Sequence, residues 1–258
     1  MHLKPLNFAK HSSIKIGQIV DVLMIDLNDE IPTNRYLIGG ANNLLLSTNP
    51  PQLMMLSKDF ATIEQEGDML VIGSAMPTGR IVSYMRKHDI AGFEFCAKLP
   101  GTLGGMLAMN AGVKSYEIFN ILHSICINGQ WILKEDIAHG YRFARLNGVA
   151  THAKFQIIKG FSQDLLEELL ALRSNQPLDP SAGSAFKNPQ GDYAGRLIEA
   201  VGLKGFVKGG MAWSEVHSNF LVNFGGGTYE EAQFLIDLAK EKVLAKFGIE
   251  MQEEIKIL

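Results

Sequence analysis

The segment Ser181–Pro189 groups residue types that can do chemistry at a ligand. It reads Ser-Ala-Gly-Ser-Ala-Phe-Lys-Asn-Pro, with two hydroxyl groups around a glycine and a lysine and an asparagine after them. Hardly any of these side chains is large enough to fill a core, so we expect the segment to approach a ligand rather than to serve packing. A serine hydroxyl can act as a general acid when its surroundings stabilise the developing charge.

Two glycine-rich segments precede it: Gly39–Asn43 (GGANN) and Pro100–Gly112 (PGTLGGMLAMNAG). In the first segment, glycine and asparagine tolerate positive φ, and successive N–H groups in such a turn can form an anion-binding nest. Bare glycines also let a cofactor's pyrophosphate lie against the backbone. The first segment has neither the GxGxxG nor the GxxxxGK spacing. A plain turn for the first and a close strand–helix crossing for the second are the alternatives.

The elements that must position these segments alternate between strands and helices, which indicates an α+β or α/β protein. Serine at 162 and the Thr228/Glu231 capping box predict helix starts, and Gly202 and Gly248 predict helix ends. The apolar spacing predicts strands near 36–38, 44–47, 68–75, 121–127, 131–133, 153–158, 218–224 and 255–257, and helices over 77–88, 162–173, 194–201 and 228–246.

Composition bounds the class of protein. The 258 residues are 47% hydrophobic with a net charge of −3, which gives no electrostatic case for nucleic acid or an anionic membrane surface. No apolar run is long enough to span a bilayer, and Met1–Gln18 lacks a secretion signal, so we expect a cytoplasmic protein. Cys96 and Cys126 are expected to be buried free thiols rather than a disulfide, and no zinc-binding spacing is present.

Read together in order, the motifs resemble the family of UDP-N-acetylenolpyruvoylglucosamine reductases. Leu99–Gly112 is similar to the family signature P-G-T-x-G-G-x-x-x-M-N-A-G, and Ser181–Pro189 to S-A-G-S-x-F-K-N-P. The remaining likeness lies in His11–Gly17, Ile38–Leu46, Gly140–Arg142, Ala194–Asn223 and Phe247–Ile257.

The resemblance implies an α+β fold: an FAD-binding domain of the vanillyl-alcohol-oxidase (PCMH) type over residues 1–170, built of two subdomains, and a smaller α+β substrate-binding domain over 171–258. The C-terminal strand of the latter would return toward the active site. FAD would bind without a covalent bond. The implied cofactor contacts are Gly39, Gly40, Ala41, Asn42, Asn43, Pro100, Gly101, Thr102, Gly104, Gly105, Asn110, Ala111 and Gly112.

The implied reaction reduces the enolpyruvyl group of a UDP-sugar in peptidoglycan precursor synthesis, with NADPH as the electron donor. By the resemblance, Ser184 is the proton donor, and Arg142 and Glu254 orient the carboxylate and stabilise the enol form. Expected substrate contacts are Arg173, Lys187 and Asn188. No metal is implied, and we take the protein to be a monomer.

The chain departs from the family pattern at several places. Ala41-Asn42 replaces the usual Gly-Ser, and Ala144 stands where a serine is frequent, so that hydroxyl is missing. Val113-Lys114-Ser115 replaces a small-aromatic-glycine turn, which puts local flavin contacts in question. The span from Arg142 to Ser184 is short, so no tyrosine-bearing lid is expected.

Two other classes of function stay open. A flavin oxidase or dehydrogenase of the same fold commonly tethers FAD through His or Cys, and Pro100–Gly112 contains neither. A non-catalytic nucleotide-binding module has no need of Ser184, Arg142 and Glu254 together. None of these three residues indicates catalysis by itself; a serine after a glycine, for example, is usually a turn residue. His217 is expected to be structural.

Overall fold

The computed structural model describes residues 1–172 and 175–258, which form two compact units. The first unit takes in residues 1–4, 22–40 and the described part of 52–174, and the second takes in 5–21, 41–51 and 175–258. The second unit therefore includes two N-terminal segments that the expected division assigned to the first domain. The roles assigned to the two domains stay predictions.

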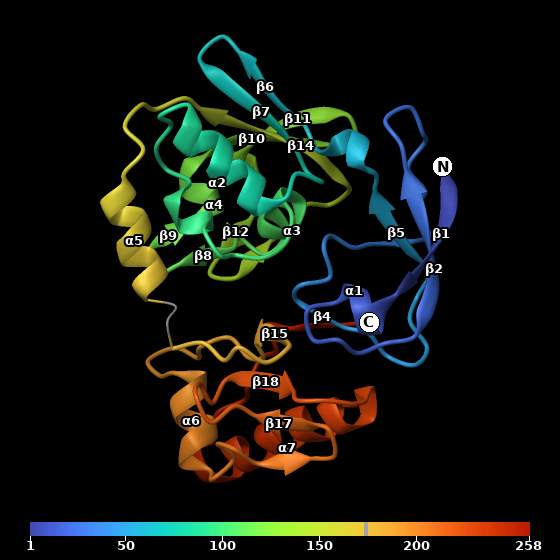
Figure 1. The fold of residues 1–258 in the computed structure, drawn as a ribbon, viewed down its shortest axis with the longest axis vertical. Coiled ribbons are helices and arrows are strands. Elements are labelled where there is room, and N and C mark those ends of the chain that lie inside the picture. Colours follow the sequence, from blue (N-terminus) through green and yellow to red (C-terminus); the bar gives the residue numbers. More distant parts are fainter. Residues whose placement is uncertain (173–174) are drawn as a thin grey trace. The chain divides into compact units, whose positions relative to one another are not determined.

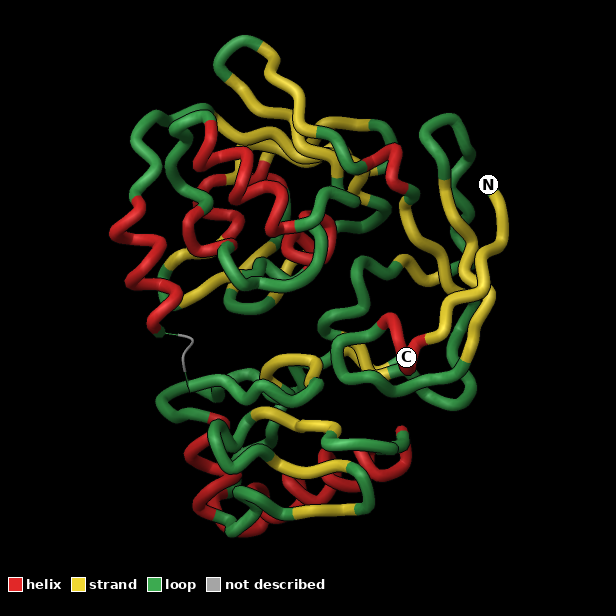
Figure 2. The backbone as a smooth tube through the Cα atoms, in the orientation of Figure 1, coloured by secondary structure: helices red, strands yellow, loops and turns green. Residues whose placement is uncertain are grey.

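The core of the first unit lies between a five-stranded antiparallel sheet and a group of helices (Figures 1 and 2). The strand order is β11 (Gln130–Leu133), β10 (Leu122–Ile127), β14 (Ala150–Gln156), β7 (Met69–Gly73) and β6 (Ile63–Glu66). The helices are α2 (Thr78–Lys87), η2 (Glu94–Cys96), α3 (Leu103–Ala108), α4 (Ile118–Ile121) and α5 (Gln163–Ala171). Ile81, Leu103 and Phe119 are fully buried helical side chains that pack in one cluster with Ile125 and Phe155 of the sheet. The predicted strands at 68–75, 121–127 and 131–133 are confirmed, whereas the strand predicted over 153–158 begins at Ala150.

Local signals explain where the helices of this unit begin. The Ser162 hydroxyl accepts a hydrogen bond from the Leu165 N–H at 3.1 Å, as predicted for the N-cap of α5. Pro77 precedes α2, where a missing N–H carries no cost. Shorter elements connect these helices and strands: η1 (Lys58–Phe60), β8 (Gly112–Val113), β9 (Tyr116–Glu117), η3 (Lys134–Asp136), β12 (His139–Gly140) and β13 (Phe143–Ala144).

A second sheet has the order β1 (His2–Asn7), β2 (Ile19–Ile25), β5 (Leu53–Leu56) and β3 (Tyr36–Leu37). Strand β5 pairs in parallel with both β2 and β3. The apolar run of β5 suits a strand between two parallel neighbours. In β2, Val22 and Ile25 are buried, whereas its first residue is exposed. Our strand predictions included 36–38 but neither β2 nor β5.

The second unit is built on the antiparallel sheet β15 (Ser181–Ser184), β18 (Phe220–Asn223), β17 (Met211–Trp213) and β16 (Val207–Lys208). Helices α6 (Ala194–Ala200) and α7 (Tyr229–Phe247) bury Leu197 and Leu235 in one core with Trp213. The N-terminal segments add α1 (Phe8–His11) and β4 (Leu44–Leu45), and β4 pairs in parallel with β19 (Lys256–Ile257).

The capping box predicted for α7 is present. The Thr228 hydroxyl accepts from the Glu231 N–H at 3.2 Å, and the Glu231 carboxylate accepts from the Thr228 N–H at 3.1 Å. Gly248 ends the helix with a φ of 68°, a left-handed conformation that glycine adopts without strain. The helix predicted over 228–246 is thus confirmed.

The α+β class is confirmed, because the sheets are largely antiparallel and the helices pack beside them. Cys96 and Cys126 are buried free thiols, as predicted, and burial raises the pKa of the Cys96 thiol. Within residues 1–172 and 175–258, no helix combines the length and apolarity that a membrane crossing requires.

Candidate active site

The first unit contains a cavity of about 1000 Å³, at the upper end of the range for small-molecule sites. Four residues expected to contact the cofactor line it: Gly39, Thr102, Gly104 and Gly105. Arg35, Lys58 and Arg80 also line it, and none of its described lining residues is Asp or Glu. The cavity therefore suits an anionic ligand.

Close packing explains the glycines in its wall. A Cβ atom on Gly39 would lie 3.0 Å from the Thr102 hydroxyl oxygen, and one on Gly104 would lie 3.1 Å from the Ser74 Cβ. Ser74 follows β7, lines the cavity and is buried, and its hydroxyl has no hydrogen-bond partner among the residues that the structure describes. Since buried polar groups are normally satisfied, a bound ligand is the natural partner of that hydroxyl.

In the Pro100–Gly112 segment, the N–H groups of Leu103 and Gly104 are bonded to backbone carbonyls of the protein. The Gly104 N–H donates to the Ser74 carbonyl at 2.8 Å, and the Leu103 N–H donates to the Met76 carbonyl at 3.0 Å. Gly104 and Gly105 lie in the first turn of α3, which we did not predict. Gly104 shapes the wall by letting α3 approach Ser74, which follows β7, as in the alternative of a close strand–helix crossing.

The Gly39–Asn43 segment also differs from the expectation. Its residue with positive φ is Ala41, at 53°, whereas Gly39, Gly40, Asn42 and Asn43 are not in the left-handed region. The side-chain amide of Asn42 donates to the Ser13 hydroxyl at 2.7 Å, and that of Asn43 donates to the Glu254 carbonyl at 2.8 Å. Residues 41–43 and their partners here belong to the second unit.

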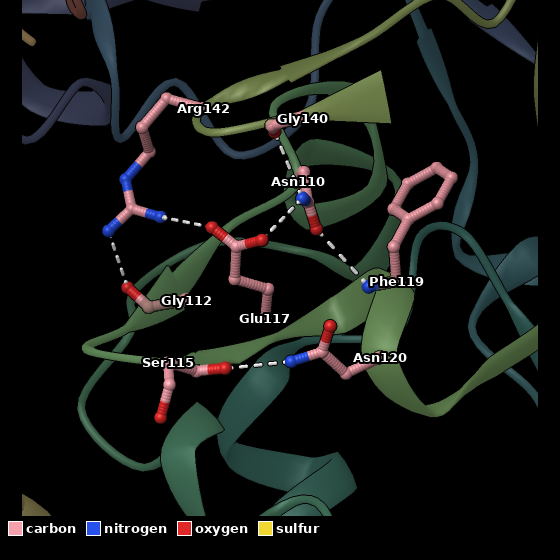
Figure 3. A network of polar contacts seen from close by, with 8 residues as sticks. All are labelled: Asn110, Gly112, Ser115, Glu117, Phe119, Asn120, Gly140 and Arg142. Carbon is pink, nitrogen blue, oxygen red and sulfur yellow. Dashed lines mark hydrogen bonds and ion pairs between the residues drawn. The ribbon is translucent and has the colours of Figure 1, made fainter. Parts of the chain in front are cut away.

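Asn110 is fully buried and forms the centre of a polar network (Figure 3). Its amide donates to the Glu117 carboxylate at 2.8 Å and to the Gly140 carbonyl at 3.0 Å, and its oxygen accepts from the Phe119 N–H at 3.2 Å. The described bonds of this side chain thus go to the protein, and its expected contact with a cofactor stays a prediction.

Arg142 is the second residue of the turn between β12 and β13 and has a φ of 53°. This conformation costs a residue other than glycine roughly 1–2 kcal/mol. Its side chain is largely buried, donates to the Gly112 carbonyl at 2.8 Å and lies 3.7 Å from the Glu117 carboxylate (Figure 3). Gly112 itself is required by its own hairpin, because a Cβ there would lie 2.0 Å from the Tyr116 carbonyl oxygen.

The second unit brings Ser184 and Glu254 to neighbouring backbone positions. Ser184 ends β15, opposite Phe220 of β18, and is half-buried. The next residue, Ala185, accepts a hydrogen bond at its carbonyl from the Glu254 N–H at 2.8 Å. The Lys187 N–H donates to the Gln252 carbonyl at 2.9 Å, so the two segments run side by side.

The Ser181–Pro189 segment serves packing as well, contrary to our expectation. Ala182, Ala185 and Phe186 are buried in the core of this unit, where Phe186 stacks on Trp213. The Asn219 side chain fixes Phe186 by accepting from its N–H at 3.0 Å and donating to its carbonyl at 2.7 Å. The segment therefore anchors its apolar side chains in the core while Ser184 stays partly accessible.

A second cavity, of about 330 Å³, includes Ser184 and lies entirely in this unit. Asn188 lines it, although its side-chain oxygen also accepts from the Ala194 N–H at the start of α6. His217 lines it too, and burial lowers the pKa of its imidazole. The expected contact at Arg173 lies outside the described residues. The other lining residues are Tyr193, Gly195, Arg196, Glu199, Val216 and Ser218.

Two residues of these sites escaped the sequence prediction. Ser74 gives a weak signal, a small polar residue directly after a strongly apolar strand. Glu117 gives none, because its relation to Arg142 depends on two hairpins that are separated in the chain.

Comparisons with known proteins place the chain in one class. Residues 175–258 match the model for the UDP-N-acetylenolpyruvoylglucosamine reductase C-terminal domain. The described fold is similar to the crystal structure of UDP-N-acetylenolpyruvylglucosamine reductase from Thermus caldophilus, with a TM-score of 0.88, 24% identity and coverage of 100% of this chain and 99% of that one. This likeness establishes the fold, an α+β fold shared with an oxidoreductase.

Closer relatives establish the family. The chain is 47% identical to the UDP-N-acetylenolpyruvoylglucosamine reductase of Helicobacter hepaticus, over 98% of each chain. It is 43% identical to the enzyme of the same name from Campylobacter jejuni, over 98% of this chain and 99% of the relative. The chain belongs to the UDP-N-acetylenolpyruvoylglucosamine reductase family, whose members are oxidoreductases, as the motifs predicted.

Proposed function

We propose that the chain is an NADPH-dependent flavoenzyme that reduces UDP-N-acetylglucosamine enolpyruvate to UDP-N-acetylmuramate, a step of peptidoglycan precursor synthesis. Family membership over nearly the whole chain supports the substrate. The observation that carries the chemistry is the hydrogen bond from the Glu254 N–H to the Ala185 carbonyl, which fixes Glu254 beside the strand that ends at Ser184.

The residues of the first cavity fit FAD. The volume, the three basic side chains and the unsatisfied Ser74 hydroxyl suit a cofactor that carries a pyrophosphate. Gly39, Thr102, Gly104 and Gly105 would form the wall against which it lies. None of the described residues that line the cavity is His or Cys, which supports non-covalent binding and disfavours an oxidase with tethered FAD.

Bound FAD would supply hydride transfer from NADPH to the β-carbon of the enolpyruvyl group. Addition at that carbon leaves negative charge on the α-carbon and the attached carboxylate. The protein must therefore provide a proton donor for the α-carbon and groups that stabilise the enol form.

We assign the proton donor to Ser184. Its hydroxyl would protonate the α-carbon, and general acid catalysis of this kind contributes about 10²–10⁴-fold to the rate. The Arg142 guanidinium would bind the carboxylate and hold the developing charge, since arginine matches a carboxylate with two parallel donors. Glu254 would orient the same group.

The substrate's nucleotide portion carries two phosphates, for which Lys187 and Asn188 are our proposed contacts. Asn188 and Ser184 line the same small cavity, which supports a shared role in the substrate site. We also propose a cytoplasmic location, where NADPH is available and where the buried free thiols would stay reduced. The monomeric state stays a prediction.

An anaerobic titration tests this function. The purified protein should be yellow, lose its colour on addition of NADPH and regain it when UDP-N-acetylglucosamine enolpyruvate is added. Mass spectrometry should then find UDP-N-acetylmuramate in an amount equal to the flavin reoxidised. The substrate's parent sugar, UDP-N-acetylglucosamine, is the control and should restore no colour.

Other outcomes identify the alternatives. A yellow protein that the enolpyruvyl sugar does not reoxidise would favour an oxidase or dehydrogenase that acts on another substrate. A protein that binds no flavin would favour a nucleotide-binding module without catalysis. Either result would refute the proposed reaction.

A further inference from the structure

We propose that Glu117 is a positioning residue that holds the Arg142 guanidinium in its working orientation. The proposal rests on the function proposed above for Arg142. The Glu117 carboxylate lies between the two other polar side chains of the network, 3.7 Å from one terminal nitrogen of Arg142 and 2.8 Å from the Asn110 amide (Figure 3).

The backbone alone leaves the guanidinium poorly defined. Arg142 sits in a two-residue turn, and its long side chain has several rotatable bonds. The Gly112 carbonyl accepts from one terminal nitrogen at 2.8 Å, and the Glu117 carboxylate faces the other terminal nitrogen. The ion pair with Glu117 acts on a different terminal nitrogen from the hydrogen bond to Gly112, so it restricts rotation of the guanidinium further than that bond does by itself.

Glu117 is itself held in place. The Asn110 amide that donates to its carboxylate also donates to the Gly140 carbonyl, just before the turn that carries Arg142. One buried side chain therefore fixes both the carboxylate and the hairpin of its partner. The aromatic stack of Phe119 on His139, with ring centres 4.4 Å apart, supports the same pair of segments.

Orientation rather than charge is the expected contribution of Glu117. Arginine side chains in proteins carry their charge without a carboxylate partner, so Glu117 is not needed to supply it. Both side chains are largely buried, with 15% of Arg142 and 20% of Glu117 exposed, so solvent screens the pair only in part. The Glu117 carboxylate partly offsets the positive charge that Arg142 presents to a ligand. Its expected benefit is that it keeps the arginine side chain in one rotamer.

Rapid-reaction kinetics of the Glu117→Ala holoenzyme test the proposal, because the two half-reactions separate positioning from folding. Reduction by NADPH should stay within about twofold of wild type. Reoxidation by the enolpyruvyl sugar should slow by about 10- to 100-fold, as expected for a misplaced reacting group. Glu117→Gln keeps an oxygen that can accept from Asn110, so reoxidation should slow less than in Glu117→Ala. If the alanine variant does not fold, the glutamine variant provides the test.

A readout without turnover is the affinity of the oxidised protein for UDP-N-acetylmuramate, measured by calorimetry. Glu117→Ala should weaken it about tenfold in the wild-type background and leave it unchanged in an Arg142→Ala background. The matched control is Asn120→Ala. This change removes the hydrogen bond from the Asn120 side chain in α4 to the Ser115 carbonyl between β8 and β9, and no dashed contact in Figure 3 joins either residue to Arg142. It should leave both half-reactions unchanged.

Three results would overturn the proposal. The first is equal slowing of both half-reactions with loss of flavin, which indicates a purely structural role. The second is a full additional loss in the Arg142→Ala background, which means that Glu117 acts independently of Arg142. The third is a wild-type protein that the enolpyruvyl sugar does not reoxidise; this refutes the proposed function itself and is seen before any variant is compared.

Discussion

Replacing Asn110 with alanine should destabilise the first unit by about 3–5 kcal/mol. The side chain is fully buried, and three protein groups depend on it: the Phe119 N–H, the Gly140 carbonyl and the Glu117 carboxylate. Alanine has no polar side-chain atom, so it cannot replace the hydrogen bonds that these three groups lose.

The magnitude follows from the surroundings of each group. A buried N–H without an acceptor costs about 1–3 kcal/mol, and Phe119 is only 2% exposed. A hydrogen bond to a charged group contributes about 1.5–3 kcal/mol, of which water recovers part at the partly exposed Glu117. Alanine must also adopt the φ of 45° at this position, which asparagine tolerates better.

Urea unfolding monitored by tryptophan fluorescence measures this loss in one unit at a time. The chain has two tryptophans, and Trp131 lies in the first unit while Trp213 lies in the second. In a Trp213→Phe background the signal comes from the first unit alone. Asn110→Asp should also destabilise it, because a carboxylate at this position has no N–H to donate to Glu117 and adds a second acidic group beside it.

The control is Asn120→Ala, which removes a single hydrogen bond at the surface and should cost less than about 1 kcal/mol. If Asn110→Ala costs no more than this control, the network does not hold the hairpins together. The account of Arg142 positioning would then lose its foundation.

Three further perturbations test other parts of the structure. Ala144→Ser adds a hydroxyl to the wall of the first cavity and should lower the FAD dissociation constant about fivefold in a titration of apoprotein; unchanged or weaker binding counts against the assignment of that cavity. Burial lowers the pKa of His217 in the folded protein, so as the pH falls the imidazole is protonated at a higher pH in the unfolded chain than in the folded one. The free energy of unfolding should therefore fall as the pH drops below about 6.5. His217→Asn should flatten this dependence in urea midpoints at pH 7.5 and 5.5, and an equally steep decline would exclude His217 as its source. Burial would raise the pKa of Glu253, but the hydrogen bond and the charge of Lys240, together with a backbone hydrogen bond, outweigh it and lower the pKa. The pair therefore stabilises at neutral pH, and its contribution is lost in acid. Lys240→Met should therefore cost about 0.5 kcal/mol at pH 7 and nothing near pH 2, and a loss that persists in acid would point to packing instead.

Elements with strong local signals were predictable from the sequence. The capping box at Thr228 and the left-handed Gly248 define α7 almost to the residue, and Ser162 marks the start of α5. Helix α3 was not predictable, because two of its six residues are glycines with low helix propensity. It is supported by tertiary contacts, such as the hydrogen bond from Gly104 to Ser74, that no local pattern reveals.

For a similar reason, the sequence did not reveal which segments of the chain make up the second unit. Strand β4 pairs with β19 at Leu44 and Lys256, residues that lie more than two hundred positions apart. The short strands at 44–45 and 256–257 were expected from their apolar residues, but their pairing depends on the complete fold.

The candidate site was predicted in part. The motifs indicated four residues of the cavity wall and both Ser184 and Glu254, which the second unit holds on paired segments. They did not show that Phe186 anchors the serine-containing segment in the core, or that the asparagine of the glycine-rich signature bonds to Glu117. Those roles depend on burial and on partners elsewhere in the chain.

The most direct test of the account is single-turnover reoxidation of reduced Ser184→Ala protein by UDP-N-acetylglucosamine enolpyruvate. We predict that NADPH reduces the bound flavin at the wild-type rate and that reoxidation slows by about 10²–10⁴-fold. Reoxidation at a near-normal rate, with UDP-N-acetylmuramate formed, would contradict the assignment of the proton donor.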